Sequence, residues 1–559
     1  MLLQIKNLSV EFANENSSTP AVCDLSFNMK ANHITALVGE SGSGKSATAF
    51  SILGLLPNTA KLSGEILYTE NSKTTNLLAL SQQEIKALRG GKIAMVFQEP
   101  MTALNPLMTC GQQVMEAIRI HQPTTKKQAQ EKTRILFNQV ELPQPEIIFN
   151  KYPHQLSGGQ LQRVMIAMAI ANGPRLLIAD EPTTALDATV QKSILHLLKK
   201  LKEQQQLSIL LISHDLGLVK AYADEVVVMY KGKMVEMGDC QQVLTSPQHT
   251  YTQALLQCKP SPEKKGQRLP TLNELMQASD QQSNPLTKSY PTKAIDRSAP
   301  ILELKNLTVE FPWKKNWWGK TTTVHKVVNE VNAFIYRNEA VGLVGESGCG
   351  KTTLGKTILQ LIRPSSGSIL LHGQPIDAKN QTPDNTDLHK IQMVFQDPYG
   401  SLNPTLSIGE AIAEPIRKHL RLNKAGAKDK VAELLGQVGL NADHYHRYPH
   451  QFSGGQRQRI SIARALAQEP SFLVFDESVS ALDMSMQAQI LNLIMELRIK
   501  YGFSCLFITH DLNVAQYLCD SIWVMQSGKI VETGSAEDVF RSPQAAYTRQ
   551  MIEAMPVWK

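Results

Sequence analysis

The amino-acid sequence contains two copies of one long pattern. The segment IKNLSVEF (residues 5–12) recurs as LKNLTVEF (residues 304–311), and the glycine-rich segment GESGSGKSAT (residues 39–48) recurs as GESGCGKTTL (residues 345–354). From Ser157 onward, matching residues are separated by a constant 296 positions. An internal repeat of this length predicts two homologous domains, each large enough to bury a core of its own.

The repeats place the first domain at residues 1–259 and the second at residues 301–559. Residues 260–300 between them are polar, nearly free of aromatic side chains and interrupted by several prolines. This composition predicts a linker without a core of its own. The prolines also argue against a continuous helix between the two domains.

The composition of the 559 residues is that of a globular protein, with 42% hydrophobic and 19% charged residues. No apolar run reaches the length of a membrane-spanning helix, and the first residues lack the features of a signal peptide, so a cytoplasmic protein is expected. The seven cysteines form no CxxC pair, which predicts reduced thiols without a bound metal. The net charge of +7 is compatible with contact to an anionic lipid surface or to nucleic acid.

Short apolar runs alternate with helical patterns in each copy. Residues 34–39 predict a buried strand that ends at the glycine-rich turn, and residues 45–56 predict the helix that follows. Residues 175–181 and 208–215 are further apolar runs of strand length that end in acidic residues or histidine. Continuous apolar strands predict a parallel sheet covered on both faces, with functional groups at the carboxyl ends of its strands.

The glycine-rich turn matches the pattern GxxxxGK[ST] in both copies, between a strand and a helix. Its glycines allow backbone N–H groups to surround phosphate oxygens, while the lysine reaches the outer phosphates and the hydroxyl binds Mg²⁺. A flexible turn is the alternative, but two matches at two strand-to-helix junctions argue against it. The predicted ATP-binding residues are Gly39, Ser41, Gly42, Gly44, Lys45, Ser46 and Ala47, and Gly345, Ser347, Gly348, Gly350, Lys351, Thr352 and Thr353.

An Asp-Glu pair follows one predicted strand in each copy. Asp180 and Asp476 suit a role beside Mg²⁺, and the adjoining Glu181 and Glu477 are positioned to polarise the water that attacks the terminal phosphate. Such a pair alone is more often a solvated loop. Its fixed order after the glycine-rich turn favours the catalytic interpretation.

Further motifs carry a family resemblance. LSGGQ (residues 156–160) and FSGGQ (residues 452–456) precede the Asp-Glu pairs, and the other motif residues are Gln98, Gln396, Asp187, Asp483, His214 and His510. Their order resembles the nucleotide-binding domains of ABC ATPases over nearly all of both copies. The resemblance implies two tandem α/β P-loop NTPase domains, each with a RecA-like parallel-sheet core, a small antiparallel β-subdomain and a helical signature subdomain.

The resemblance also implies an intrachain pseudo-dimer in which each ATP lies between the P-loop of one domain and the signature of the other. The implied signature contacts are Ser157, Gly158, Gly159 and Gln160, and Ser453, Gly454, Gly455 and Gln456. The implied catalytic residues are Gln98, Glu181 and His214, and Gln396, Glu477 and His510. The implied Mg²⁺ residues are Ser46, Gln98 and Asp180, and Thr352, Gln396 and Asp476. Since neither set has lost a chemical residue, both sites are expected to hydrolyse ATP.

Three side features give further expectations. Phe12 and Phe311 precede the P-loops where relatives stack an aromatic ring on adenine, although a phenylalanine in a strand is usually core. Cys349 lies beside Lys351, and this cation together with the helix N-terminus is expected to favour the thiolate, so that a thiol reagent would block the second site. The insertion PWKKNWWGK (residues 312–320) is expected to be a hairpin lid, with a membrane-interface contact as the alternative.

Other segments narrow the family. Four groups of segments resemble the ATPases of the dipeptide, oligopeptide and nickel importers. They are FQEPMTALNP (residues 97–106), FQDPYGSLNP (residues 395–404), the two YPHQ segments and the SPQ segments near both domain ends. The presence of two copies in one chain resembles the fused ATPases of the glutathione and microcin C importers. This implies a peripheral subunit at the cytoplasmic face of the inner membrane, with two permease subunits, a periplasmic substrate-binding protein as an indirect partner and no nucleic acid. Only Cys258 lies where relatives carry an iron–sulfur cluster, so no cluster is expected. The alternative is a soluble twin-ABC ATPase that acts on ribosomes or nucleic acid.

Overall fold

The computed structural model describes residues 1–14, 17–184, 186–281, 289–291, 294–315, 321–376, 389–480 and 482–555. These residues form two compact units. The first comprises Met1–Gln257 with Ser279–Gln281, and the second comprises Cys258–Ala278 and the described residues from Ser289 to Met555. Among the described residues, no helix has the length and apolar character that a membrane span requires.

Two sheets form the described framework of the first unit. A six-stranded sheet has the order β10-β9-β3-β8-β7-β6, with parallel pairing between all neighbours except β9 and β10. A four-stranded antiparallel sheet has the order β2-β1-β4-β5. The strands are β1 Leu3–Asn14, β2 Ser17–Met29, β3 Ile34–Val38, β4 Ala60–Glu70, β5 Lys73–Asn76, β6 Ile93–Val96, β7 Leu176–Asp180, β8 Ser208–Ile212, β9 Glu225–Tyr230 and β10 Lys233–Asp239.

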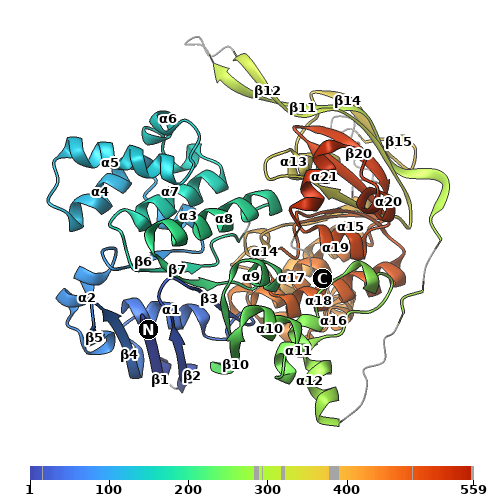
Figure 1. Cartoon of the computed structure of the whole chain (residues 1–559). Coiled ribbons are helices and arrows are strands. Elements are labelled where there is room, and N and C mark those ends of the chain that lie inside the picture. Colours follow the sequence, from blue (N-terminus) through green and yellow to red (C-terminus); the bar gives the residue numbers. More distant parts are fainter. Residues whose placement is uncertain are drawn as a thin grey trace. The chain divides into compact units, whose positions relative to one another are not determined.

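The three central strands β3, β7 and β8 are buried along their whole length, as their unbroken apolar sequences predict. Helices α4, α5 and α6 group at one end of the unit, away from the antiparallel sheet (Figure 1). The helices are α1 Lys45–Leu53, α2 Gln82–Leu88, α3 Pro100–Ala103, α4 Cys110–His121, α5 Lys126–Gln139, α6 Pro145–Phe149, α7 Gly158–Ile170, α8 Ala188–Gln205, α9 Leu216–Tyr222, α10 Cys240–Thr245 and α11 Thr250–Gln257.

The second unit repeats this architecture. Its described sheets have the orders β16-β17-β18-β13-β19-β20 and β12-β11-β14-β15, and only β19–β20 is antiparallel in the larger one. The strands are β11 Asp296–Lys315, β12 Thr321–Arg337, β13 Ala340–Val344, β14 Ser366–Leu371, β15 Gln374–Pro375, β16 Ile391–Val394, β17 Phe472–Asp476, β18 Ser504–Ile508, β19 Ser521–Gln526 and β20 Lys529–Ser535. The predicted fold is therefore confirmed in both copies.

The helices of the second unit follow the same order around the sheets. They are α13 Lys351–Ile358, α14 Pro398–Ser401, α15 Ile408–His419, α16 Lys424–Gln437, α17 Gly454–Leu466, α18 Met484–Tyr501, α19 Leu512–Leu518, α20 Ala536–Arg541 and α21 Ala546–Glu553, preceded by α12 Leu272–Gln281, whose residues up to Ala278 belong to this unit. Residues 258–278, most of which were expected to be linker, lie with this unit. Leu269 and Leu272 are 0% and 4% exposed, so the segment has apolar anchors that its polar composition concealed.

The insertion at residues 312–320 extends a hairpin. Strand β11 continues to Lys315, where it pairs with Thr321 at the start of β12. The strands therefore support the hairpin arm, while residues 316–320 lie outside the described residues. The lid and membrane interpretations of this arm both stay predictions.

Candidate functional site

The first glycine-rich loop connects β3 to α1. Gly42 and Gly44 have φ angles of 78° and 100°, and Gly44 is the N-cap of α1, so the loop enters the helix through left-handed backbone. At Gly39 an added Cβ would lie 2.2 Å from the carbonyl oxygen of Met229. The pattern of glycines thus follows from backbone geometry and close approach.

Lys45 begins helix α1 and folds back over the loop. Its ammonium group donates hydrogen bonds to the carbonyl oxygens of Gly39 (2.9 Å) and Glu40 (2.7 Å), and the residue is only 6% exposed. The second loop repeats this arrangement, because Lys351 donates to the carbonyl oxygens of Gly345 and Glu346 at 2.8 Å each. Each loop therefore holds a buried cation at a helix N-terminus, which is a suitable environment for phosphate.

One loop residue differs between the copies in a chemically important way. Lys45 Nζ lies 3.4 Å from the hydroxyl of Ser43, whereas Lys351 Nζ lies 3.9 Å from the Cys349 sulfur. Burial raises the pKa of the Cys349 thiol, and Lys351 only partly offsets this. The expectation that the thiolate is favoured is therefore wrong, because the loss of hydration outweighs the nearby cation.

The hydroxyl that follows each lysine meets the first carboxylate of the Asp-Glu pair. Ser46 Oγ donates to Asp180 at 3.3 Å, and Thr352 Oγ1 donates to Asp476 at 3.0 Å. Burial raises the pKa of Asp180 to about 6, and the Ser46 hydrogen bond opposes this shift. A buried carboxylate with a raised pKa gains most from a neighbouring cation, which restores the charged form.

These groups fit Mg²⁺, which prefers oxygen ligands. The described residues contain no cluster of three or more acidic, histidine or cysteine side chains that could hold a metal. A hydroxyl and one carboxylate leave positions for phosphate oxygens and water, which Mg²⁺ usually keeps. Ser46 with Asp180, and Thr352 with Asp476, are thus suited to hold the ion together with a nucleotide.

Glu181 is the centre of a hydrogen-bonded cluster at the end of β7. Its Oε2 accepts from Gln98 Nε2 (3.0 Å) and Thr184 Oγ1 (2.8 Å), and lies 3.2 Å from His214 Nδ1. Glu181 has a φ angle of 45°, in the left-handed region that is uncommon for residues other than glycine. Three predicted residues, Gln98, Glu181 and His214, are therefore brought together.

The protonation of this cluster follows from its pairing. Burial favours the neutral form of Glu181, but the hydrogen bond and charge of His214 prevail and lower its pKa to about 2. Burial likewise opposes protonation of His214, and Glu181 outweighs it, so the pKa of the imidazole is raised. The carboxylate is ionised at neutral pH and available as a proton acceptor.

The second copy has the same cluster with one difference. Glu477 Oε2 accepts from Gln396 at 2.8 Å, its Oε1 lies 3.5 Å from His510 Nδ1, and its φ is also 45°. Burial opposes the lowered pKa of Glu477, and His510 again accounts for its direction. Ser480, which corresponds to Thr184, donates to the backbone oxygen of Glu477 instead of its carboxylate. Sequence reasoning missed Thr184, although its place three residues after the glutamate was the available signal.

The signature segments begin helices α7 and α17. Ser157 caps α7 and Ser453 caps α17, each through a reciprocal capping box with the glutamine three residues later. The serines and the glycines that follow them, Gly158 and Gly454, are exposed. Each signature therefore presents a helix N-terminus to the surface of its own unit, where an anion is favoured.

The two aromatic candidates have different surroundings. Phe12 on β1 is partly buried against the core cluster of its unit, whereas Phe311 on β11 is 40% exposed. A core role therefore accounts for part of the Phe12 surface. Adenine stacking stays a prediction for both rings, and the case is better for Phe311.

Comparison with known proteins gives the same pattern of domains. The family described as ABC transporter matches residues 22–184 and 328–480. The family described as oligopeptide/dipeptide transporter, C-terminal region, matches residues 235–285 and 531–559. The first of these two ranges, residues 235–285, includes residues 258–278, which the structure groups with the second unit.

Two curated relatives span nearly the whole chain. The glutathione import ATP-binding protein GsiA of Pectobacterium atrosepticum is 41% identical over 100% of this chain and 90% of its own length. The peptidoglycan transport ATP-binding protein YejF of Agrobacterium fabrum is 45% identical over 99% of this chain and 96% of its own. Among solved structures, an ATP-binding cassette dimer in a post-hydrolysis state bound to ADP and Pi is 28% identical over 43% of this chain and 99% of its own, with a TM-score of 0.39. The chain therefore belongs to the ABC transporter ATP-binding proteins, and it is an ATPase with two cassettes.

Proposed function

We propose that this chain is the fused ATP-binding subunit of a bacterial ABC importer for peptide-class substrates, such as small peptides or glutathione-like compounds. The observation that supports this most is the pairing of two chemically complete clusters around Glu181 and Glu477 with the oligopeptide/dipeptide C-terminal region. The names of the two relatives, which concern glutathione import and peptidoglycan transport, agree with a peptide-like cargo.

In the proposed reaction, the P-loop binds the phosphates and the Asp-Glu pair directs water. Lys45 or Lys351 exchanges its carbonyl partners for phosphate oxygens, and Glu181 or Glu477 accepts a proton from the attacking water. His214 and His510 hold these carboxylates ionised and oriented. Bound Mg²⁺ supplies charge stabilisation to the phosphates beside Ser46 and Asp180, or beside Thr352 and Asp476.

Each site is proposed to combine residues of both cassettes. The exposed α17 N-terminus, with Ser453 to Gln456, contacts the ATP held by Lys45, and the α7 N-terminus, with Ser157 to Gln160, contacts the ATP held by Lys351. Two helix N-termini then face one triphosphate, one from each cassette, which favours its negative charge. This arrangement gives a reason for joining two cassettes in one chain.

Gly454 allows a direct test of this composite geometry. A Cβ at Gly454 meets nothing within 4 Å, so Gly454→Asp introduces a carboxylate at the α17 N-terminus without a clash in its own unit. When the two sites turn over independently, two backgrounds separate them, since Glu477→Gln then leaves the first site active and Glu181→Gln leaves the second active. We expect Gly454→Asp to abolish ATP turnover in the Glu477→Gln background and to spare it in the Glu181→Gln background. Loss of turnover in the Glu181→Gln background alone would contradict the proposal.

Gly436 provides the matched control for this test. It also has no atom within 4 Å of an added Cβ, and it lies near the end of α16. Gly436→Asp should leave turnover in both backgrounds unchanged. A loss equal to that of Gly454→Asp would indicate a general effect of added negative charge.

Permease contacts are proposed at the segments that follow Gln98 and Gln396. In the first unit, the apolar side chains of Met101 and Leu107 are 53% and 85% exposed, which is typical of a surface that binds another protein. In the second unit, Tyr399 is 48% exposed, and nearby a cavity of about 470 Å³ is lined by residues that include Met393, Phe395 and Glu414. Two permease subunits would each occupy one such surface, at the cytoplasmic face of the inner membrane, with a periplasmic binding protein delivering the cargo.

Uptake by cells tests the function itself. Deletion of the gene should abolish uptake of at least one labelled substrate among dipeptides, tripeptides and glutathione, while uptake of free amino acids continues. The unaltered gene should restore uptake, and the Glu181→Gln, Glu477→Gln double variant should not. Unchanged uptake of the whole series in the deletion strain would contradict the proposed cargo class.

A further inference from the structure

The segment that follows the first cassette is fastened to the second. We call residues 258–278 and 289–291 the strap. Lys265 Nζ donates to the carbonyl oxygen of Cys519 at 2.7 Å, and the hydroxyl of Tyr517 donates to the carbonyl oxygen of Gln267 at 2.7 Å. The strap thus contacts both the end of α19 and the residue after it.

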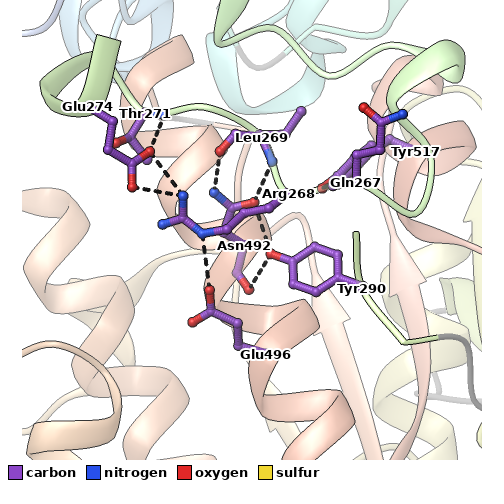
Figure 2. Close-up of polar contacts among 9 residues, drawn as sticks. All are labelled: Gln267, Arg268, Leu269, Thr271, Glu274, Tyr290, Asn492, Glu496 and Tyr517. Atoms are coloured by element: carbon purple, nitrogen blue, oxygen red, sulfur yellow. Dashed lines mark hydrogen bonds and ion pairs between the residues drawn. The ribbon is translucent and has the colours of Figure 1, made fainter. Parts of the chain in front are cut away.

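Asn492 is the central anchor of the strap (Figure 2). Its amide accepts from the Leu269 N–H at 2.9 Å and donates to the Leu269 carbonyl oxygen at 2.7 Å. The Tyr290 hydroxyl also donates to Asn492 Oδ1 at 3.2 Å. Asn492 is only 3% exposed, and a buried amide is costly unless it is hydrogen-bonded, so the strap satisfies a polar group that the cassette itself has buried.

An ion-pair chain flanks this anchor. Arg268 donates to both oxygens of Glu274 at 2.8 and 3.0 Å within the strap, and its Nε lies 3.4 Å from Glu496 on α18 (Figure 2). These side chains are partly exposed, so the pairs add orientation more than stability. Specific docking therefore depends mainly on Asn492 and the two tyrosines.

The first copy carries different residues at the corresponding positions. With the constant offset of 296, Asn492, Glu496 and Tyr517 correspond to His196, Lys200 and Ala221. His196 is exposed, whereas Asn492 is buried beneath the strap. At these positions, the groups that contact the strap are thus present in the second cassette and absent from the first.

The two helices that the strap contacts lead directly from the second site. Helix α18 begins after its N-cap Asp483, which ends the ALD motif, and α19 begins after Asp511, which follows His510. Asn492 lies midway along α18, and Tyr517 lies at the far end of α19. Because helices are stiff on this length scale, a shift at the strap would be carried along them to the segments around Asp483 and His510.

The space beside the anchor permits such a shift. A cavity of about 290 Å³ lies between strap and cassette, and its lining includes Lys265, Tyr290, Arg498 and Tyr517. The strap is therefore packed against the cassette at Leu269 and Leu272, whereas open space lies beside Lys265 and Tyr290. Movement of the part around Lys265 and Tyr290 between two docked positions does not require the packed core to rearrange.

We propose that the strap couples the C-terminal end of the first cassette to ATP turnover at the second site. Helix α11 of the first cassette ends at Gln257, immediately before the strap, so any displacement of α11 reaches α18 and α19 through a short covalent path. Asn492, Tyr517 and Tyr290 act as positioning residues for Asp483 and His510. This inference rests on the proposed two-site hydrolysis for its effect on turnover, but not for its effect on structure.

Hydrogen exchange of the full chain tests the coupling without requiring hydrolysis. The Glu181→Gln, Glu477→Gln double variant is saturated with ATP and Mg²⁺, and exchange is compared with and without the added pair Tyr290→Phe and Tyr517→Phe. These changes remove two hydroxyls and leave both rings in place. We expect faster exchange at residues 482–490 and 509–515, with no change at residues 186–194 and 213–219 of the first copy.

Two comparisons separate coupling from a local or general loss of structure. Asn492→Leu, which removes the anchor at similar volume, should produce the same pattern more strongly, and His196→Leu at the corresponding position should produce none. An effect confined to the strap, or an equal effect in both copies, would overturn the inference. The melting temperature should fall only modestly in the tyrosine variant, because each lost hydrogen bond makes a small net contribution to stability.

Steady-state turnover gives the functional readout. In the chain with both glutamates intact, Tyr290→Phe with Tyr517→Phe should lower ATP turnover about 2- to 30-fold and leave the KM for ATP unchanged. Unchanged turnover together with unchanged exchange at residues 482–490 refutes the coupling. If the unaltered chain hydrolyses no ATP, the proposed function fails, and the exchange experiment still decides the structural inference.

Discussion

Replacement of Glu181 or Glu477 by glutamine is the sharpest test of the chemistry. Glutamine has the shape of glutamate and keeps an oxygen that can accept from Gln98 and Thr184. The cluster around Glu181 should therefore persist, and ATP should still bind. What disappears is the ability to accept a proton, since the carboxylate with its pKa of about 2 is lost.

The magnitude follows from the role of a general base. Removal of such a group typically lowers the rate about 10²- to 10⁴-fold, which corresponds to about 3–5 kcal/mol of activation free energy. If the two sites work independently and equally, each single variant keeps about half of the turnover. If the sites work in obligatory alternation, each single variant falls to the level of the double variant. In both cases the double variant keeps less than about 1% of the turnover.

The assay is steady-state phosphate release by the full chain, with nucleotide binding measured in parallel by equilibrium dialysis. Full turnover in Glu181→Gln would mean that the first site is not catalytic. Turnover above about a tenth in the double variant would refute the general-base assignment for both glutamates.

Three further predictions concern individual side chains. In the Glu477→Gln background, His214→Ala should raise the pKa of Glu181 from about 2, because the buried carboxyl loses its partner. The acid limb of the pH–rate profile should then move to higher pH. An unmoved limb would contradict the pairing of Glu181 with His214. Cys349 should react slowly with a maleimide at pH 7, faster as the pH rises, and not at all when ATP is bound. The Cys349→Ser variant serves as the control that lacks this thiol. Labelling of Cys349 that does not respond to nucleotide would contradict the prediction. In the Glu181→Gln background, Phe311→Ala should raise the KM for ATP a few-fold with little change in melting temperature, since the ring is 40% exposed; an unchanged KM removes adenine stacking.

The parts of the site that lie within one local motif were predictable from sequence. The loop from Gly39 to Ser46 is determined by glycines with left-handed backbone and by the buried strand before it. Asp180 was placed correctly at the end of a buried strand because the apolar run LLIAD admits only that position. These features depend on neighbours within a few residues, which is where sequence patterns are informative.

Features that depend on distant partners were not predictable. The sign of the Cys349 pKa shift follows from burial, which the local sequence does not reveal, and the nearby Lys351 suggested the opposite. The strap appeared to be a linker because its apolar anchors are few, and Leu269 meets Asn492 from 223 residues away. The hydrogen bond from Thr184 to the Glu181 carboxylate could have been anticipated from spacing. The different choice of Ser480, which donates to the backbone oxygen of Glu477, could not.

The location of the strap determines where the polypeptide can be divided. A cut near residue 300, at the carboxyl-terminal end of the predicted linker, would leave Leu269 and Leu272 as solvent-exposed apolar groups on the amino-terminal piece and would uncover the Asn492 amide on the other. A cut between Gln257 and Cys258 keeps Leu269 and Leu272 together with the second unit, against which they are buried. Co-expressed pieces divided there should be soluble, whereas pieces divided near residue 300 should aggregate. The boundary between the two compact units thus lies just before the linker predicted at residues 260–300, and not at its carboxyl-terminal end.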